Sequence, residues 1–425
     1  MIWSKYYKTM YIKREIEEAI LEVSKSFPCV VVYGPRQVGK STTVNHLFGD
    51  SFKSVTLDDL DDRLLAQNSP RLFLETYGSP LIIDEIQKAP ILLDEIKKII
   101  DNKRLQWLKE EREPQLLYVL TGSNRFELQQ GISDSLAGRC GIVDMASLSQ
   151  REKDGNSGPL FSPDIGVLLE RENKCPLKTK TRAEIFESIF QGGMPEIITG
   201  HAKRNVYFKS YVNTYIEKDV KQLINASSET VFRNFLDIVA LRTARELSYE
   251  EISSSVGIDV KTCKRWISIL ETAGIIYLLQ PFMTNLSSRI IKSPKLYFMD
   301  TGLCSYLCKW PNAEMLSSCA MSGVFFETFV VSEIVKNLCS HNLEPKEFLF
   351  YYRDKDQKEI DLVFVNRDKI YPIEIKSGVA PQKSTKNFSV LDKYNLNIQP
   401  GLVIDSSEKI RPINEKAYFF PVSWL

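Results

Sequence analysis

The sequence predicts an α/β protein whose first part is built around a parallel sheet. Short apolar runs alternate with segments of helical periodicity such as 92–107, and the runs lie at 29–33, 55–57, 81–83, 116–120 and 142–145. Apolar runs of this length, bounded by turn residues, are typical of buried parallel strands. Strands that alternate with helices indicate a parallel α/β sheet. A glycine-rich turn directly follows the run 29–33, at a sheet edge where such proteins bind ligands.

Length and composition exclude several classes of protein. At roughly 150 residues per domain, 425 residues predict two or three domains. The chain is 43% hydrophobic and 26% charged, which excludes a mostly disordered, collagen-like or coiled-coil protein. With 55 basic and 54 acidic residues, any contact with DNA must come from a local patch. Scattered cysteines without a CxxC pair do not favour a zinc site. No membrane-length apolar stretch or signal peptide is evident, so we expect a cytoplasmic protein.

The first domain is predicted to cover residues 1–150. An amphipathic helix is expected at 12–26, where isoleucines recur at helical spacing. The run 29–33 then leads into Gly34-Pro-Arg-Gln-Val-Gly-Lys-Ser41, which has the Walker A pattern G-x-x-x-x-G-K-[ST] between a strand and a helix. In such a loop, Lys40 reaches the β- and γ-phosphates of a nucleotide and the Ser41 hydroxyl ligates Mg²⁺. The predicted nucleotide-binding residues of the loop are Gly34, Pro35, Arg36, Gln37, Val38, Gly39, Lys40, Ser41 and Thr42.

Two carboxylates follow the apolar run 81–83 and predict the partner motif of this loop. Asp84 is expected to hold Mg²⁺ as a Walker B aspartate does. Glu85 is placed to activate the attacking water as a general base. An Asp-Glu pair after a strand is also typical of an ordinary helix N-cap. Beside a Walker A motif, the catalytic interpretation is favoured.

Two further positions could act on the nucleotide. The run 116–120 is expected next to the two nucleotide strands, and it leads into Thr121-Gly-Ser-Asn, so Ser123 or Asn124 could sense the γ-phosphate. The alternative is a simple turn, because Gly-Ser-Asn is turn chemistry. Arg139 could act on a phosphate in its own site or in a neighbour's site. A solvated surface arginine is the other interpretation of Arg139.

Five motifs together resemble a widespread prokaryotic family of AAA-superfamily ATPases. They are GPRQVGKS, LIIDEIQKAP, LTGSN, SLAGR and GGMPE, which occur in this order. The resemblance covers nearly the whole chain apart from 152–182. The resemblance implies an ASCE-type P-loop fold and ATP as the nucleotide. Members of this family carry a C-terminal region of uncharacterised type, so the resemblance supplies no cellular task.

Residues 151–229 are predicted to be a linker or insertion followed by a helical lid region. The stretch 152–159 has the composition of a loop, and a helix is expected around 167–172. From 182 to about 225 the pattern is helical, interrupted by Gly192-Gly-Met-Pro195.

Residues 230–294 are predicted to form a winged helix-turn-helix. Ser248 can cap a helix that runs to 256, Gly257 makes the turn, and a second helix at 260–272 precedes a strand. The second helix would offer Lys261, Lys264 and Arg265 to DNA. Residues 230–292 contain 8 basic and 6 acidic side chains, a net charge of only +2, so a protein-interaction or lid module is the alternative.

Residues 295–425 are predicted to form a second α/β domain. Strands are expected at 348–352, 360–365, 371–375 and 402–404. A hairpin places Asp361 beside Glu374 and Lys376, which share one face of their strand. This spacing is similar to the PD-(D/E)XK nuclease superfamily, with Ile360 in place of the proline and Glu327 as the further helical glutamate. The resemblance implies a restriction-endonuclease-like fold, with Glu327, Asp361 and Glu374 as metal ligands. Exposed charges in an ordinary hairpin are the alternative.

These features predict a cytoplasmic ATPase that uses ATP and Mg²⁺. Its nucleotide state is expected to control binding of double-stranded DNA by the C-terminal part, with Mg-dependent DNA cleavage left open. In the alternative, ATP sets the conformation of a switch whose inactive nuclease-like domain binds DNA or protein. The sequence leaves open whether the chain binds a protein partner or forms a homo-oligomer, and no membrane partner is expected. The predicted catalytic residues are Lys40, Asp84, Glu85, Asp361, Glu374 and Lys376.

Overall fold

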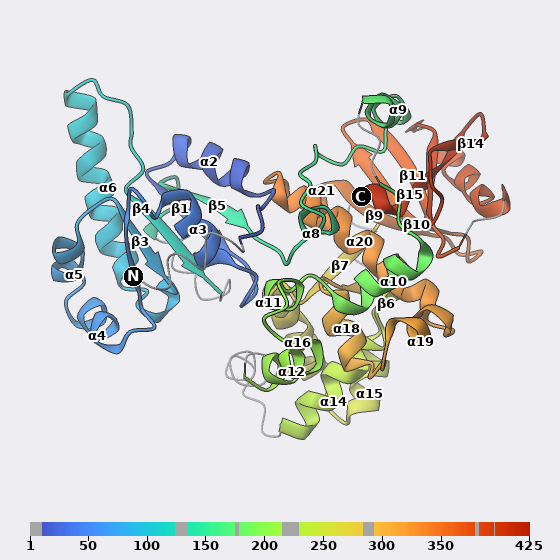
Figure 1. The fold of residues 1–425 in the computed structure, drawn as a ribbon, viewed down its shortest axis with the longest axis horizontal. Helices are drawn as coiled ribbons and strands as arrows, with labels where there is room; N and C mark the ends of the chain where they lie inside the picture. Colours follow the sequence, from blue (N-terminus) through green and yellow to red (C-terminus); the bar gives the residue numbers. More distant parts are fainter. Residues whose placement is uncertain are drawn as a thin grey trace. The chain divides into compact units, whose positions relative to one another are not determined.

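The chain folds into two compact units, one formed mainly by residues up to Leu148 and one mainly by residues from Ser149 onward. The computed structural model in Figure 1 describes residues 11–123, 135–174, 178–214, 229–283, 293–378, 382–394 and 396–425. In these ranges, no helix is long and apolar enough to cross a membrane.

The first unit contains a parallel five-stranded sheet with strand order β2-β3-β4-β1-β5. The strands are β1 (Cys29–Tyr33), β2 (Lys53–Thr56), β3 (Leu81–Asp84), β4 (Tyr118–Gly122) and β5 (Cys140–Asp144). Every neighbouring pair is parallel, and β4 lies between β1 and β3. The predicted parallel sheet is therefore confirmed, as is the place of the third strand next to both nucleotide strands.

Helices of the first unit bury the apolar side chains of this sheet. They are α2 (Glu17–Ser26), α3 (Lys40–Phe48), α4 (Leu60–Asn68), α5 (Pro70–Tyr77), the 3-10 turn η1 (Ile86–Lys88) and α6 (Leu92–Lys109). One core combines alternate strand residues such as Val31 and Ile83 with Phe73 of α5 and Ile96 of α6. Because side chains alternate between the faces of a strand, Val30 and Val32, which are also fully buried, face the other side.

The first helix is shorter than predicted. It begins at Glu17, not at residue 12. The backbone N–H of Arg14 donates a 2.7 Å hydrogen bond to the carboxylate of Glu17, and the Arg14 side chain reaches away to backbone carbonyls elsewhere in the unit. These contacts hold the preceding residues in a turn, so the helical periodicity of the sequence extends further than the helix itself.

The second unit contains a mixed ten-stranded sheet of order β14-β15-β13-β11-β10-β9-β7-β8-β6, with β12 paired to β11. Its strands are β6 (Arg245–Glu246), β7 (Ile276–Pro281), β8 (Lys295–Phe298), β9 (Leu349–Arg353), β10 (Glu359–Asn366), β11 (Lys369–Ile375), β12 (Asn397–Ile398), β13 (Gly401–Asp405), β14 (Arg411–Asn414) and β15 (Ala417–Pro421). The four strands predicted between 348 and 404 are therefore confirmed. The unit is α/β, with a mixed sheet of unknown type.

The second unit also contains helices and 3-10 turns. They are α8 (Gln150–Lys153), α9 (Ile165–Lys174), α10 (Arg182–Gln191), α11 (Pro195–Ile198), α12 (Arg204–Tyr211), α14 (Glu229–Ala240), α15 (Tyr249–Val256), α16 (Val260–Thr272), α18 (Thr301–Leu307), α19 (Ala313–Ser318), α20 (Ser322–Ser340), α21 (Pro345–Phe348), η3 (Gln382–Thr385), η4 (Phe388–Tyr394) and η5 (Val422–Trp424). Helices α15 and α16 have the predicted bounds. Ser248 and Asp259 each accept a backbone hydrogen bond at the start of one of them.

The division predicted between residues 294 and 295 falls inside a pair of strands. Strands β7 and β8 pair antiparallel, β6 pairs with β8, and β7 also pairs with β9 through Gln280 and Pro281. Nearly all residues of β7 and β8 are buried, so both strands need neighbours. This pair therefore links β6 to the following strands in one sheet.

The segment 151–182, predicted as a linker or insertion, packs within the second unit. Helix α8 ends at Lys153, and residues 154–159 form most of the loop expected at 152–159. Arg151 donates a 2.7 Å hydrogen bond to the carbonyl of Trp424. Phe161 contacts the rings of Phe364 and Phe420 edge to face. These long-range contacts, invisible in the composition of the segment, make it part of the core.

The glycine pair of the GGMPE motif has a structural explanation. Gly192 ends α10 with φ of 78°, and a Cβ there would lie 2.4 Å from Oδ1 of Asp300. The N–H of Gly193 donates a 2.8 Å hydrogen bond to Oδ2 of the same aspartate. Only glycine fits this approach, so the predicted break in the helical pattern is real and is held by Asp300.

Candidate nucleotide site and C-terminal carboxylate cluster

The glycine-rich loop lies between β1 and α3, where the motif requires it. Gly34 has φ of 152°, and a Cβ there would lie 2.0 Å from the carbonyl oxygen of Met145. Gly39 precedes α3 in the left-handed conformation and has no side chain to cap the helix. The first N–H groups of α3 are thus available to an anion, and the helix N-terminus favours negative charge.

Lys40 is buried and turned back onto its own loop. Lys40 is only 5% exposed, and its Nζ donates hydrogen bonds to the carbonyls of Gly34 (2.9 Å) and Pro35 (2.8 Å). Burial lowers the pKa of Lys40 to about 8, against the opposing effect of Glu85 and Asp84, which raise it. The loop therefore holds a cationic group at the place where phosphates would bind.

Asp84 accepts hydrogen bonds from hydroxyl groups on two neighbouring elements. Ser41 Oγ donates a 2.7 Å hydrogen bond to Asp84 Oδ1, and Thr121 Oγ1 donates to the same oxygen. The parallel register of β3 and β4 aligns Ile83 with Leu120, so that Asp84 and Thr121 follow side by side. Hydroxyl and carboxylate oxygens are the donors that Mg²⁺ prefers. The residues present therefore fit a magnesium ion between Ser41 and Asp84.

Glu85 lies in a backbone conformation that is rare for a side-chain-bearing residue, with φ of 57°. Its Oε2 accepts a hydrogen bond from Ser123 Oγ (3.1 Å) and another from Gln87 Nε2. Outliers of this kind concentrate at functional sites. The structure thus brings Glu85 and Ser123 together, whereas Asn124 lies outside the described residues.

Sequence reasoning missed three residues that contact this site. Thr121 and Gln87 contact the two carboxylates, and aligning the last apolar residues of the runs 81–83 and 116–120 would have placed Thr121 beside Asp84. Arg14, which is 5% exposed, donates from Nη1 to the carbonyl of Val38 (2.7 Å) and from Nη2 to that of Ala146 (2.8 Å). No motif signals Arg14. The other predicted loop residues, Pro35, Arg36, Gln37 and Thr42, lie between β1 and the first turn of α3.

Arg139 is not brought together with the phosphate loop of its own chain. It forms two hydrogen bonds with Asp101 of α6, Nε–Oδ1 at 2.6 Å and Nη2–Oδ2 at 3.0 Å. In the parallel register Cys29 aligns with Cys140, so Arg139 precedes β5 at the edge where β1 begins. The loop follows the opposite end of β1, a five-residue strand that spans about 16 Å at about 3.3 Å per residue. In this structure Arg139 therefore lies at the edge of the sheet opposite the phosphate loop of its own chain.

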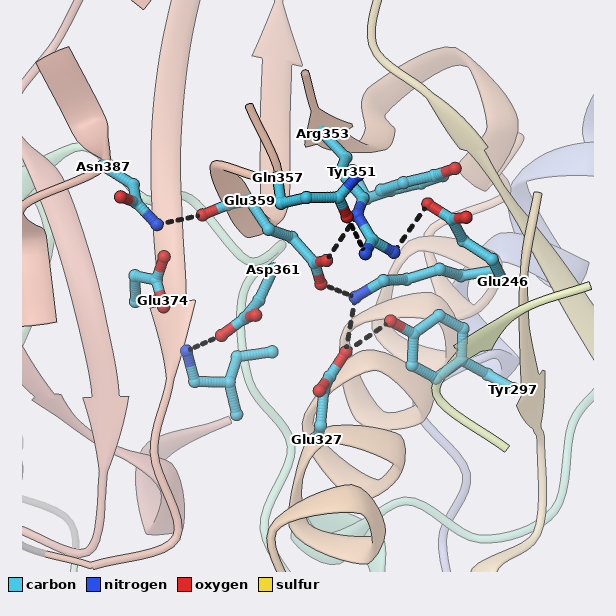
Figure 2. Close-up of polar contacts among 12 residues, drawn as sticks. Glu246, Tyr297, Glu327, Tyr351, Arg353, Gln357, Glu359, Asp361, Glu374 and Asn387 are labelled. Atoms are coloured by element: carbon cyan, nitrogen blue, oxygen red, sulfur yellow. Dashed lines mark hydrogen bonds and ion pairs between the residues drawn. The ribbon is translucent and has the colours of Figure 1, made fainter. Parts of the chain in front are cut away.

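In the second unit, the predicted hairpin places Asp361 beside Glu374 (Figure 2). Strand pairing aligns Leu362 with Ile373, and the backbone N–H of Ile375 donates a 2.8 Å hydrogen bond to Asp361 Oδ2. Lys376 Nζ contacts Glu374 Oε2 at 2.7 Å and Asp361 Oδ2 at 3.3 Å. Burial, followed by the charge of Asp361, raises the pKa of Glu374 to about 8.

Glu327 of α20 contacts a second lysine, Lys295. Its Oε1 accepts hydrogen bonds from Lys295 Nζ (3.2 Å) and Tyr297 OH (2.7 Å). Lys295 Nζ also lies 2.5 Å from Glu359 Oε1. Figure 2 shows Tyr297, Glu327 and Glu359 converging from different elements. Burial raises the pKa of Glu327 to about 6. The positive charge of Lys295 opposes this rise, and the charge of Asp361 adds to it.

The predicted set of metal ligands Glu327, Asp361 and Glu374 is therefore not assembled as a metal site. Within the described ranges, no group of three or more histidine, cysteine, aspartate or glutamate side chains is arranged to hold a metal ion. The physical reason is that two ammonium groups, those of Lys295 and Lys376, each engage a pair of the carboxylates.

Comparisons with known proteins support the assignment of the first unit. Residues 26–153 match the family described as AAA domain, while residues 182–314 and 322–425 match two domains of unknown function, DUF8612 and DUF4143. The chain thus contains an AAA-type P-loop ATPase domain followed by two uncharacterised domains. The uncharacterized proteins Rv2008c of Mycobacterium tuberculosis and Mb2031c of Mycobacterium bovis are each 25% identical over 403 residues, which cover 94% of this chain and 81% of theirs.

Solved structures show weaker likeness. A Walker-type ATPase of Pyrococcus abyssi, PabY2304, has a TM-score of 0.41 at 15% identity, covering 70% of this chain and 96% of its own. A point mutant of RuvB from Thermotoga maritima has a TM-score of 0.30 at 17% identity, covering 63% of this chain and 91% of its own.

Proposed function

We propose that this protein binds Mg–ATP in its first unit and hydrolyses it. The observation that carries the proposal is the meeting of Ser41, Asp84 and Thr121 beside the phosphate loop. These oxygens come from α3, β3 and β4, three elements that meet at the carboxyl edge of one parallel sheet. A sheet edge of this kind is the usual ligand site of an α/β fold.

Each residue has a distinct part in the proposed reaction. Lys40 exchanges its contacts with the loop carbonyls for the phosphate oxygens of ATP. Ser41 and Asp84 hold Mg²⁺, which neutralises charge on the phosphates when it is bound. Glu85 accepts a proton from the attacking water, and its contacts with Ser123 and Gln87 keep its carboxylate oriented.

ATP binding and phosphate release should be measured separately to test this proposal. Lys40→Ala is expected to lose binding, whereas Glu85→Gln is expected to keep binding and lose at least 100-fold in turnover, the scale of general-base catalysis. Glu75→Gln serves as a matched control, because Glu75 is exposed on α5 and pairs only with Arg71 among the contacts described. Wild-type turnover in Glu85→Gln would reject Glu85 as the base, and wild-type binding in Lys40→Ala would reject the site.

We further propose that α15, α16 and the strands β6, β7 and β8 act as a winged helix whose binding to double-stranded DNA depends on the nucleotide. The favouring observation is the division of α16 into two faces. Lys261, Lys264 and Arg265 are exposed, while Cys263, Trp266, Ile267 and Leu270 are buried. Exposed basic residues on the second helix of such a motif suit contact with DNA phosphates.

Fluorescence anisotropy with a labelled duplex, with and without ATP, tests this second proposal. The double substitution Lys261→Gln and Lys264→Gln is expected to weaken binding and to reduce its salt dependence by about two phosphate contacts. Lys174→Gln, on the exposed surface of α9, is the control. If the double variant binds DNA as the wild type does, the surface of α16 serves a protein partner instead.

Between a nuclease and a switch, the side-chain contacts favour the switch. Lysines engage the four acidic side chains Glu327, Glu359, Asp361 and Glu374 in the second unit. In this proposal, ATP hydrolysis in the first unit sets the conformation of a second unit that binds and does not cut.

A further inference from the structure

We infer that Lys295 is the resident cation of the carboxylate cluster in the second unit and that it keeps this cluster from binding a divalent metal ion. The cluster is defined by Glu327, Glu359, Asp361 and Glu374. This inference goes beyond ATP hydrolysis in the first unit, and its failure would leave that proposal untouched.

The position of Lys295 is determined by the sheet. Lys295 begins β8 and pairs with Glu246 of β6 on one side and Leu279 of β7 on the other. Tyr297 lies two residues further along β8, so both side chains project from the same face of the strand. They converge on one oxygen, Oε1 of Glu327, at 3.2 Å from Lys295 Nζ and 2.7 Å from Tyr297 OH.

The surroundings leave Lys295 little freedom. Its side chain is 4% exposed, and those of Glu327 and Glu359 are 16% and 29% exposed. A buried ammonium is tolerated only where carboxylates pair with it. Burial alone would lower the pKa of Lys295, but Tyr297, Glu327 and Glu359 together raise it well above its ordinary value. A second cation in contact with the same oxygens would be repelled at close range.

The remaining carboxylates have their own ammonium. Lys376 contacts both Asp361 and Glu374, so the cluster is divided into two pairs, each bridged by one lysine. A metal ion shared by Glu327, Asp361 and Glu374 would have to break the ion pair between Lys295 and Glu327. Lys295 thus supplies from β8 the positive charge that a divalent ion would otherwise supply.

The same lysine links the helix-turn-helix strands to the rest of the sheet. Arg353 of β9 forms two ion pairs (Figure 2). Its Nε lies 3.7 Å from Glu359 Oε2, and its Nη1 lies 3.1 Å from Oε1 of Glu246 in β6. The ion pairs therefore run from β6 through β9 and β10 to β8 and α20. This arrangement gives the cluster a structural role, because it ties β6 and β8 to the C-terminal strands.

Binding of Mn²⁺ measured by electron paramagnetic resonance of the free ion tests the inference. All proteins should carry Asp84→Asn, which removes the expected metal ligand of the first unit. The parent is expected to bind no Mn²⁺ at the cluster, and Lys295→Arg, which keeps the charge, should behave in the same way. Lys295→Met is expected to gain one Mn²⁺ per chain, with at least tenfold higher affinity than the parent, and to lose it again when Glu327→Gln is added.

A second variant protects the test against misfolding. The double substitution Lys295→Met and Glu359→Gln removes one positive and one negative charge, so the charge balance is kept while Glu327, Asp361 and Glu374 remain. This variant is also expected to gain Mn²⁺ binding and to unfold at a higher temperature when Mn²⁺ is present. The inference is overturned if the parent binds Mn²⁺ in a manner lost with Glu374→Gln, or if neither variant, once folded, binds the ion.

Discussion

Arg14 Nη1 donates a 2.7 Å hydrogen bond to the carbonyl oxygen of Val38, so a side chain that precedes α2 holds the phosphate loop from outside its motif. The other terminal nitrogen, Nη2, donates to the carbonyl of Ala146 just beyond β5. One guanidinium thereby joins the loop to the end of the neighbouring strand. Because the residue is only 5% exposed, these carbonyls would lose a buried charged donor on its removal.

Substitution of Arg14 should therefore weaken nucleotide binding more than catalysis. Arg14→Met removes a charged hydrogen bond to the loop, on the scale of about 1.5–3 kcal/mol. We expect the KM for ATP to rise about tenfold or more, with a smaller fall in kcat. Arg71→Met, on an exposed arginine of α5, is the matched control. An unchanged KM in folded Arg14→Met protein would show that the loop keeps its shape without this contact.

Thr121 should matter for turnover although it lies outside the Walker motifs. Thr121→Val keeps the shape of the side chain but removes the hydroxyl that donates to Asp84 and accepts from the N–H of Glu85. We expect kcat to fall at least tenfold, because the Asp84 carboxylate and the backbone N–H of Glu85 each lose a positioning contact. Steady-state ATPase rates would be compared with Thr76→Val, whose hydroxyl contacts a helical carbonyl of α5. Equal rates in the two variants would contradict this role.

Gly34 should not tolerate a side chain. In Gly34→Ala the new Cβ meets the carbonyl of Met145 at 2.0 Å, so the backbone of the loop must move. Gly155→Ala is the control, since Gly155 also has positive φ, 70°, but open space around a Cβ. We expect about 1–2 kcal/mol of strain in Gly155→Ala with normal ATP binding. In Gly34→Ala we expect a larger loss of stability and loss of ATP binding, measured by denaturation and calorimetry.

Arg139 and Asp101 should behave as a structural pair. Their side chains are 26% and 41% exposed, so removal of the ion pair is expected to cost at most about 1 kcal/mol of stability. We expect kcat to be unchanged in Arg139→Ala and also in Asp101→Asn. A loss of turnover in Arg139→Ala alone, growing with protein concentration, would show instead that Arg139 acts on the nucleotide of a neighbouring chain.

Lys153 makes the stability of the second unit depend on pH. Burial lowers the pKa of Lys153 to about 8, although Glu333 raises it, and Nζ donates to the carbonyl of Gly192 at 3.0 Å. Above pH 8 the folded chain releases this proton, while the unfolded chain keeps it up to its ordinary pKa of 10.5. The folded state therefore gains stability as the pH rises through this interval, by about 3 kcal/mol at most.

Urea denaturation of wild type and Lys153→Met between pH 7 and pH 10 measures this contribution. At pH 7 the variant is expected to be as stable as the wild type or more stable, because methionine avoids burial of a charge. Toward pH 10 the wild type should gain relative to the variant. Lys174→Met, on a side chain 73% exposed, should show no such trend. A constant difference across the range would show that Lys153 stays charged in the fold.

Local chemistry explains which features could be predicted. The strands β1, β3 and β4, the helices α15 and α16 with their caps Ser248 and Asp259, and the break at Gly192 depend on apolar runs, capping side chains and backbone freedom. These signals act between residues close in the chain. Thr121 and Arg14 were missed because their contacts join residues 37 and 24 positions apart.

The sequence by itself determined the parallel sheet, the phosphate loop after β1 and the carboxylates after β3, since each follows from the residue types on one short segment. Tertiary structure alone decided three further points. It placed Arg139 at the edge of the sheet opposite the loop, because strand direction sets which ends meet. It joined β6, β7 and β8 to the C-terminal strands through the pairing of β7 with β9. It brought Lys295 between Glu327 and Glu359, because charges distant in sequence find their partners only when strands pair and buried groups must be neutralised.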